Sequence, residues 1–277
     1  MENHPEVAYL GPEGSFASLL ARQRFPEHRL VPQPTIRDVV RYVQNGPDRL
    51  GVVPIENSSG GIIYDTVDSF AEESFNLYIR EELGIHVNLA LIGRRGQAVE
   101  KIYSHWVALK HCGDWLEEQF PGARSQAVNS TSEAASIAAR EDSKAVAIST
   151  RDSAVRYGLD VLVYPIQENF YNRTQFFVLG REPNLENQME TSIIVTLDDT
   201  PGALYHLLRP FDKNKVNLRR ILSRNIPGRT DAQKFFIGIE GAESDRKIQK
   251  ALKKANKVAS RIRILGSYPC ILEPFNS

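Results

Sequence analysis

Residues 6–25, EVAYLGPEGSFASLLARQRF, decide the fold class of this chain. An apolar run ends in a Gly-Pro-Glu-Gly turn and is followed by a helical pattern that Ser15 can cap, which predicts a strand, a turn and a helix. The same order continues, because 29–34 predicts a strand, 35–46 a helix and 49–57 a third strand. Strands that alternate with helices are typical of a parallel α/β sheet.

The alternation continues to residue 180 and then changes. Residues 77–94 contain two extended runs, and further strands precede helical patterns between 99 and 158. Residues 181–192, REPNLENQMETS, are polar, contain proline and lack periodicity, which indicates a linker that we place at 184–190. Beyond the linker, 191–277 show the order strand, helix, strand, strand, helix, strand, which is typical of ferredoxin-like modules.

The composition argues against several classes of protein. The 277 residues carry no net charge, and the basic run at 246–264 fits the solvated side of an amphipathic helix, so we expect no nucleic-acid partner. No window approaches the roughly 18 apolar residues of a membrane span, and no secretory leader is evident, so we expect a cytoplasmic protein without membrane contact. Cys112 and Cys270 form no CxxC pair and are interpreted as reduced structural thiols.

Residues 171–180, YNRTQFFVLG, place polar side chains at the mouth of an apolar strand. One interpretation is that a strand simply emerges from a loop. The other is that Thr174 is a catalytic hydroxyl at the edge of a cleft. The choice between them depends on whether other polar groups gather at the same place.

Three more strings join an apolar strand to hydroxyl or amide groups: GPEGSF with Ser15, VVPIENSSGGI with Asn57 and Ser58, and NSTSEAA with Ser130 and Thr131. Each has a plain alternative, namely a capped helix, a turn and a capping box. Helix N-termini attract anions, however, and ligands of open α/β sheets lie beyond the carboxyl ends of the strands. Together with Thr174, the strings predict a pocket for a small molecule that bears carboxylates.

His105, in YSHW, follows an apolar strand. A histidine there can act as an acid or base near neutral pH, or it can form a hydrogen bond at the start of a helix. The sequence contains neither a nucleophile elbow with its triad nor the spacing of metal ligands, so we expect no metal site.

In their order, these strings resemble the prephenate dehydratase family: YLGPEGSFA, VVPIENSSGG, YSHWVALKHC, NSTSEAA and NRTQFFV. PGALYHLL, and LGSYP at 265–269, resemble the ACT domain that follows the catalytic region in that family. The likeness covers nearly the whole chain. It implies a two-lobed α/β catalytic region like that of periplasmic binding proteins at 1–183, with the second lobe at about 82–160, and a ferredoxin-like ACT domain at 191–277.

The family converts prephenate to phenylpyruvate, with loss of carbon dioxide and water, on the route to phenylalanine. No cofactor is needed. The resemblance implies that Thr174 donates a hydrogen bond to the departing hydroxyl, and that the substrate is held by Ser15, Asn57, Ser58, Ser130, Thr131, Arg173, Gln175 and Phe176. It further implies a homodimer or homotetramer joined through the ACT domains, with phenylalanine as effector at Gly202, Ala203, Leu204, Leu222, Ser223 and Arg224.

The chain departs from the family at functional positions. The family's Thr-Arg-Phe is Thr-Gln-Phe at 174–176, and our hypothesis is that Arg173, on the same strand face as Gln175, supplies the lost guanidinium; the alternative is a solvent-exposed arginine. The family's Ser-His-Pro-Gln is Ser-His-Trp-Val at 104–107. Its Glu-Ser-Arg-Pro is Leu-Ser-Arg-Asn at 222–225, and the lost carboxylate predicts weak or altered sensitivity to phenylalanine.

Two alternative functions stay open. One is a prephenate decarboxylase of specialised metabolism that does not dehydrate, which the retention of Thr174 argues against. The other is a catalytically silent paralogue that senses metabolites through its ACT domain, which the accumulated departures favour. The substrate of an active enzyme is either prephenate or its amino analogue arogenate.

Overall fold

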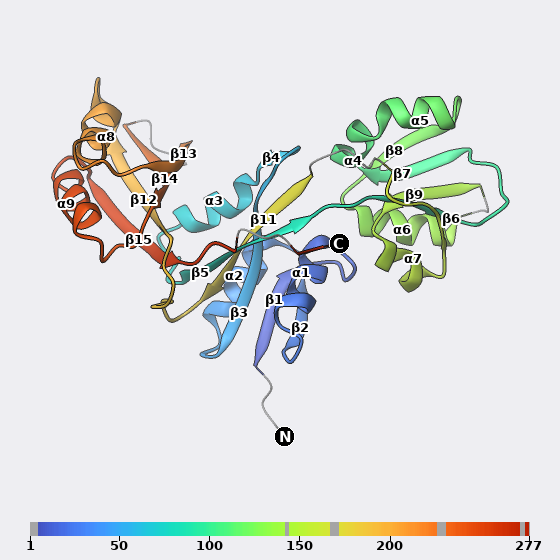
Figure 1. Cartoon of the computed structure of the whole chain (residues 1–277), viewed down its shortest axis with the longest axis horizontal. Coiled ribbons are helices and arrows are strands. Elements are labelled where there is room, and N and C mark those ends of the chain that lie inside the picture. The colour runs from blue at the N-terminus through green and yellow to red at the C-terminus, as the bar shows by residue number, and fades with distance from the viewer. Residues whose placement is uncertain (1–4, 142–143, 167–171, 226–230, 272–274, 277) are drawn as a thin grey trace.

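The computed structural model describes residues 5–141, 144–166, 172–225, 231–271 and 275–276. Figure 1 shows three bodies in a row, with a first lobe in the centre, a second lobe on one side and a C-terminal module on the other. Among the described residues, no helix combines the length and the apolar character that crossing a bilayer requires. The lobes and the module are described in turn because the candidate site depends on how they meet.

The first lobe is built on a seven-stranded sheet in the order β16-β5-β11-β3-β1-β2, with β4 beside β3. Its strands are β1 (Glu6–Leu10), β2 (Arg29–Gln33), β3 (Arg49–Asn57), β4 (Gly61–Ile62), β5 (Tyr78–His86), β11 (Arg173–Gly180) and β16 (Phe275–Asn276). The helices are α1 (Phe16–Arg24), α2 (Ile36–Gln44) and α3 (Tyr64–Ala71). The first three strands are parallel, as predicted.

The sheet as a whole is mixed, which corrects the prediction of a parallel sheet. β11 runs antiparallel to both β3 and β5, because the chain leaves the first lobe along β5 and returns along β11 after completing the second lobe. β5 therefore belongs to the first sheet, and the strands of the second lobe follow His86 in the chain.

The second lobe has a five-stranded mixed sheet in the order β10-β6-β9-β7-β8. Its strands are β6 (Ala90–Gly93), β7 (Lys101–His105), β8 (Arg124–Val128), β9 (Ala145–Ser149) and β10 (Asp160–Val163), and its helices are α4 (Trp106–His111), α5 (Gly113–Gln119), α6 (Thr131–Arg140) and α7 (Arg151–Tyr157). Cys112 separates α4 from α5. Burial raises the pKa of that free thiol to about 11.

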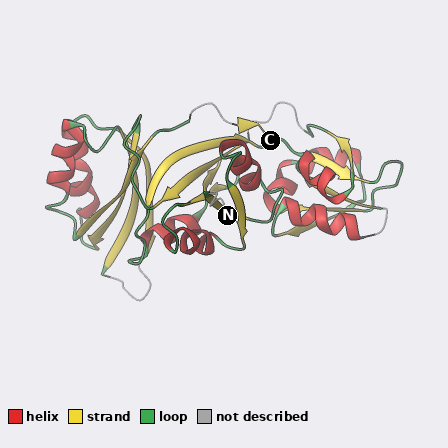
Figure 2. Cartoon of the chain, turned by 90° about the horizontal axis from the view of Figure 1, so that it is seen from below, coloured by secondary structure: helices red, strands yellow, loops and turns green. Residues whose placement is uncertain are grey.

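The C-terminal module has the predicted βαββαβ order: β12 (Glu190–Asp198), α8 (Ala203–Lys213), β13 (Leu218–Asn225), β14 (Ala232–Glu240), α9 (Arg246–Ala255) and β15 (Arg261–Tyr268). The strands form one antiparallel sheet in the order β13-β14-β12-β15. Figure 2 shows the helices on the outer side of this sheet, turned away from the first lobe. On α9, Ile248 and Ala251 are buried, which leaves the lysines to the solvated side as predicted.

The module is packed onto the first lobe through a shared aromatic core. Phe177 of β11 lies 6.2 Å from Phe236 of β14 and 5.5 Å from Tyr268 of β15, measured between ring centroids, and all three rings are buried. Beyond Tyr268 the chain returns to the first sheet, where the backbone N–H of Glu82 in β5 donates to the carbonyl of Pro269 at 2.9 Å. The last described residues therefore extend the first sheet instead of the module.

The turn before α1 holds the two lobes together. The hydroxyl of Ser132 donates to the carbonyl of Glu13 at 2.9 Å, and the hydroxyl of Thr150 donates to the carbonyl of Gly14 at 3.3 Å. Gly14 has a φ of +85°, and a Cβ there would lie 3.3 Å from the hydroxyls of Ser132 and Ser153. A glycine thus permits both the backbone conformation and the close approach of the second lobe.

Candidate active site

A cleft of about 780 Å³ is lined by residues of both lobes. The first lobe contributes Ser15, Asn57, Asn172, Thr174 and Phe176, and the second contributes His105, Trp106, Ser130 and Thr131. Five of the strings singled out in the sequence therefore meet at one cavity, although they are far apart in the chain. Tyr171, which begins one of those strings, lies outside the described residues.

Asn57 and Thr174 form a fixed pair in the wall of this cleft. The Nδ2 group of Asn57 donates to Oγ1 of Thr174 at 2.8 Å. The Oδ1 atom of Asn57 accepts the backbone N–H groups of Ser59 at 3.0 Å and Gly60 at 2.7 Å, and these two donors fix the orientation of the amide. Oγ1 of Thr174 is therefore an acceptor toward Asn57, and its own O–H finds no acceptor within the described part of the chain.

Asn172 is a cleft residue that the sequence analysis did not propose. Its Oδ1 atom accepts from Nδ2 of Asn57 at 2.9 Å, and its side chain is as buried as that of Thr174, each residue being 7% exposed. The signal that could have found it is spacing, because residues two apart on an extended chain point to the same side. Asn172, Asn57 and Thr174 therefore form one hydrogen-bonded group.

Two helices begin at the cleft, and each is capped by a predicted serine. The Oγ atom of Ser15 accepts from the N–H of Ser18 at 3.3 Å at the start of α1. The Oγ atom of Ser130 accepts from the N–H of Glu133 at 3.0 Å at the start of α6, where Thr131 is the first helical residue. Both serines are the N-caps that the sequence suggested. Because both also line the cavity, the N-termini of α1 and α6 lie at its wall.

The electrostatics of the cleft come from dipoles more than from charged side chains. Among the described residues that line it, there is no arginine or lysine. Glu133 is the one carboxylate, and its Oε2 atom accepts from the N–H of Asn129 at 3.0 Å in the cap of α6. The N-termini of α1 and α6 supply partial positive charge and backbone N–H groups, so they provide the attraction for an anionic ligand.

Arg173 and Gln175 lie on the side of β11 that faces away from the cleft, because side chains alternate along a strand. Nη2 of Arg173 donates to the carbonyl of Ile271 at 3.4 Å, and Nε2 of Gln175 donates to Oε1 of Glu82 at 2.8 Å. Neither side chain lines the cleft. This geometry places both side chains on the opposite face of β11 from Thr174, away from the cavity that Arg173 was expected to supply with a guanidinium.

Ser58 is also absent from the lining of the cleft. Its N–H donates to the carbonyl of Arg173 at 2.9 Å, and its Oγ atom accepts from the N–H of Arg173 at 3.0 Å. Ser58 therefore joins the ends of β3 and β11 and lies outside the cavity that it was expected to line. Its contribution is to hold the strand that carries Thr174.

His105 and Trp106 lie side by side on the cleft wall, with ring centroids 5.8 Å apart. Burial lowers the pKa of His105, so the imidazole is neutral near pH 7. Trp106 is 54% exposed, and it stands where the family has proline. The pair therefore adds an uncharged aromatic wall to the second lobe.

The residues expected to bind an effector divide into two groups. Gly202 precedes α8 with a φ of +82°, next to Ala203 and the 37% exposed Leu204. On β13, Leu222 packs against the aromatic core shared with the first lobe, and Arg224 pairs with Asp68 of α3, whereas Ser223 between them is exposed. Leu222 and Arg224 thus face the first lobe.

Known proteins resemble this chain in both sequence and structure. The sequence model of the family described as prephenate dehydratase matches residues 7–184. A bifunctional chorismate mutase/prephenate dehydratase of Aquifex aeolicus is 36% identical over 273 residues, which cover 97% of this chain and 75% of that protein. A prephenate dehydratase of Lactococcus lactis subsp. lactis is 32% identical over 273 residues, covering 95% and 97%.

A solved structure extends the likeness to three dimensions. Prephenate dehydratase from Arthrobacter aurescens, in complex with L-Phe, superposes with a TM-score of 0.86 at 29% identity, over 95% of this chain and 90% of that one. The superposition includes the C-terminal module as well as both lobes, since it leaves only a small part of either chain unmatched. The chain therefore belongs to the prephenate dehydratase family, the hydro-lyases of phenylalanine biosynthesis.

Proposed function

We propose that the cleft dehydrates and decarboxylates prephenate with the hydroxyl of Thr174 as the hydrogen-bond donor to the leaving group. The observation that carries this assignment is the orientation of Asn57, whose amide donates to the oxygen of Thr174. Because that oxygen is already an acceptor, the hydroxyl hydrogen is left to point at a ligand. A mobile hydroxyl is thereby turned into a directed donor at the cavity wall.

The bond changes explain why one weak donor is enough. The C–C bond to the ring carboxylate breaks and releases carbon dioxide, and its electron pair enters the ring. The C–O bond at the opposite carbon then breaks, and the oxygen takes a proton from solvent and leaves as water. The ring becomes aromatic, so the reaction is strongly downhill. A donor aimed at the oxygen on which charge develops lowers the barrier without giving up its own proton.

The remaining cleft groups would position the substrate. The N-termini of α1 and α6 are suited to carboxylates, and they come from different lobes, so a dianion would bridge the cleft. Phe176 and Trp106 offer apolar surface to the ring. Holding the ring and both carboxylates in the reactive orientation accounts for several kcal/mol of the barrier in reactions of this kind, roughly 7–11 at the upper limit.

Turnover of prephenate by two variants at one position tests the proposal. Thr174→Ala should lower kcat by about 10²–10³-fold, the usual cost of removing one preorganised donor, whereas Thr174→Ser should keep most of the activity. Thr200→Ala, at an exposed threonine of the C-terminal module, is the matched control. The product should be phenylpyruvate, identified by its absorbance and by mass. A Thr174→Ala enzyme that turns over as fast as the control would overturn the proposal, and a dihydro product would favour a decarboxylase.

For the C-terminal module, the proposed effector is L-phenylalanine, bound near Gly202 and Leu204 in a homodimer that pairs through β13. The support is the relative from Arthrobacter aurescens described in complex with L-Phe, together with the edge position of β13 and its 41% exposed Ile221. The weak or altered sensitivity expected from the lost carboxylate at Leu222 stays a prediction, and the Leu222 side chain packs toward the first lobe. Calorimetric titration should show saturable heat that Leu204→Arg removes; no heat with the unchanged protein would contradict the assignment.

A further inference from the structure

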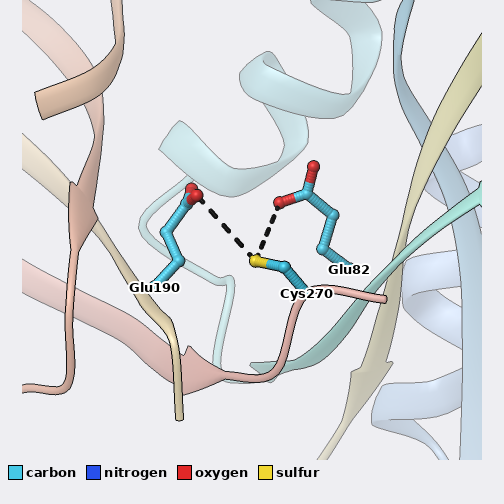
Figure 3. A group of neighbouring side chains, drawn as sticks. All are labelled: Glu82, Glu190 and Cys270. Atoms are coloured by element: carbon cyan, nitrogen blue, oxygen red, sulfur yellow. Dashed lines mark hydrogen bonds between the residues drawn. The ribbon is translucent and has the colours of Figure 1, made fainter. Parts of the chain in front are cut away.

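A buried cluster of charged side chains lies where the module meets the first lobe. Figure 3 shows Glu82 of β5, Glu190 of β12 and Cys270 converging on one point. Arg220 of β13 completes the cluster, and the side chains of Glu82, Glu190 and Arg220 are 5%, 0% and 9% exposed. Charges this deep are retained only with good partners, so their arrangement asks for an explanation.

The cluster is arranged around a guanidinium. Nη1 of Arg220 lies 3.1 Å from Oε2 of Glu82 and 3.0 Å from Oε1 of Glu190, and Nη2 donates to Oε1 of Glu82. Burial and the two carboxylates raise the pKa of the Cys270 thiol, which keeps its proton and donates to Glu82 at 3.5 Å. Although three ligand-type side chains converge here, a metal ion would have to displace Arg220.

Arg220 also reaches both strands of the catalytic pair. Glu82, the partner of Arg220, accepts a hydrogen bond from Nε2 of Gln175 at 2.8 Å. The Nε atom of Arg220 itself lies 3.5 Å from Oε2 of Glu56. In the pairing of β11 with β3, Gln175 stands opposite Glu56, and the next pair along is Thr174 opposite Asn57. One guanidinium from the module is therefore linked to the two residues directly adjacent to the Asn57–Thr174 pair.

We propose that Arg220 is a positioning residue for the reaction: through Glu82 and Gln175 on one strand, and through Glu56 on the other, it sets the separation and angle between Thr174 and Asn57. The proposal rests on the function proposed for Thr174. It makes the module part of the catalytic machinery even when no effector is bound. β13 also carries Leu222 and Arg224, so the strand expected to serve regulation is the strand that braces the catalytic pair.

Docking of the module does not account for the cluster. The aromatic core of Phe177, Phe236 and Tyr268 already joins the two bodies, and Arg224 pairs with Asp68 at the same contact. A buried ion cluster is often replaceable by apolar side chains without loss of stability. Its particular contribution here is to fix the orientation of side chains: the bidentate guanidinium holds the carboxylate of Glu82, and that carboxylate holds the amide of Gln175.

The test compares two neighbouring arginines of β13. Arg220→Gln should lower kcat for prephenate by about ten- to a hundredfold, with a change in KM of less than about threefold, because the misplaced donor acts in the transition state. Arg219→Gln is the matched control, since Arg219 lies 3.5 Å from Glu190 and makes no contact with Glu82 or Glu56 within the described residues. Arg220→Lys should recover part of kcat, because it keeps the charge without the fork.

The same substitution in a Thr174→Ala background separates the two proposals. If Arg220 acts through Thr174, Arg220→Gln lowers kcat no further there, and an equal loss in both backgrounds would overturn the inference. Unchanged kcat for Arg220→Gln alone would overturn it as well. Full activity of Thr174→Ala would instead refute the proposed function.

A further variant, Gln175→Ala, decides the matter if Arg220→Gln fails to fold. It removes the link between Glu82 and β11 and leaves the ion cluster intact, so a normal kcat would reject the inference.

Discussion

The two sides of the β3–β11 strand pair differ in kind. On the cleft side stand Asn57 and Thr174, which are uncharged, and no arginine or lysine lines that cavity within the described residues. On the side that faces the module, one residue away along each strand, Glu56 and Gln175 connect to the buried charges of Glu82, Glu190 and Arg220. Full charges thus lie behind the Asn57–Thr174 pair, and helix dipoles lie in front of it.

The difference has a physical reason. Prephenate is a dianion, and a fixed cation against the carboxylate that departs would stabilise the ground state more than the transition state, in which that charge is being lost. Helix N-termini attract the dianion more weakly and over a larger surface. Full charges are more useful behind the strands, where strong and directional pairs hold the donors still.

The largest expected effect is on stability and concerns the charged side. Arg220→Gln leaves Glu82 buried without its cation and leaves Glu190 with only the partly exposed Arg219, so the free energy of unfolding should fall by about 3–5 kcal/mol. Thr174→Ala removes one hydroxyl and should cost no more than about 1.5 kcal/mol. Urea denaturation of the two variants measures both values. Equal losses would mean that the two sides do not differ in the way described.

On the cleft side of the strand pair, adding a charge should strongly impair catalysis. Asn57→Asp replaces the donor to Thr174 with an anionic acceptor, which would draw the threonine O–H away from the substrate and repel a dianion. We expect kcat/KM to fall by about 10²–10³-fold. Asn76→Asp, at an exposed position of the first lobe, controls for the change of charge. Comparable loss in both variants would show that net charge, not the pair, is responsible.

The neutrality of His105 gives a prediction about pH. Burial lowers its pKa in the folded protein, whereas the unfolded chain takes up a proton near pH 6.5. Acidification from pH 7.5 through 6.5 toward the lowered folded pKa therefore favours unfolding, and this part of the pH dependence should vanish in His105→Gln. A titration followed by NMR should place the midpoint of His105 below 6.5. A midpoint above that value would mean that the cleft holds a cation at its wall.

The smallest effect concerns the helix caps. Ser15→Ala should lower the free energy of unfolding by about 1 kcal/mol, because the N-terminus of α1 loses a partner. Thr35→Ala should cost a similar amount at α2, since Thr35 accepts from the N–H of Asp38 in the same way but does not line the cleft. Only Ser15→Ala should raise KM for prephenate. A rise in both variants would attribute the effect to stability alone.

Much of the neutral side could be predicted from the sequence because its signals are local. Ser15 and Ser130 are N-caps that can be recognised within a few residues, and the strings around Asn57 and Thr174 mark strand ends. The βαββαβ order of the module was also correctly predicted, since each of its elements has its own periodicity. The direction of β11 could not be predicted, because it depends on the whole second lobe that the chain completes between β5 and β11.

The charged side could not be predicted, because its partners are distant in the chain. Arg220 and Glu82 are 138 residues apart, and neither lies in a string that the sequence analysis singled out. In the sequence, Gln175 stands where the family has arginine, which points to Arg173 as the replacement for the lost guanidinium. Both expectations assumed that polar residues beside Thr174 face the substrate, whereas the alternation of β11 turns them toward Glu82 and Ile271.

A crystal structure of the slow Thr174→Ala enzyme with prephenate bound would test the central claim most directly. The account predicts that the ring hydroxyl lies within hydrogen-bond distance of the place that Oγ1 of Thr174 occupies, that the carboxylates meet the N-termini of α1 and α6, and that no arginine or lysine touches the ligand. A ring hydroxyl turned toward the second lobe, or a carboxylate paired with a basic side chain, would contradict it.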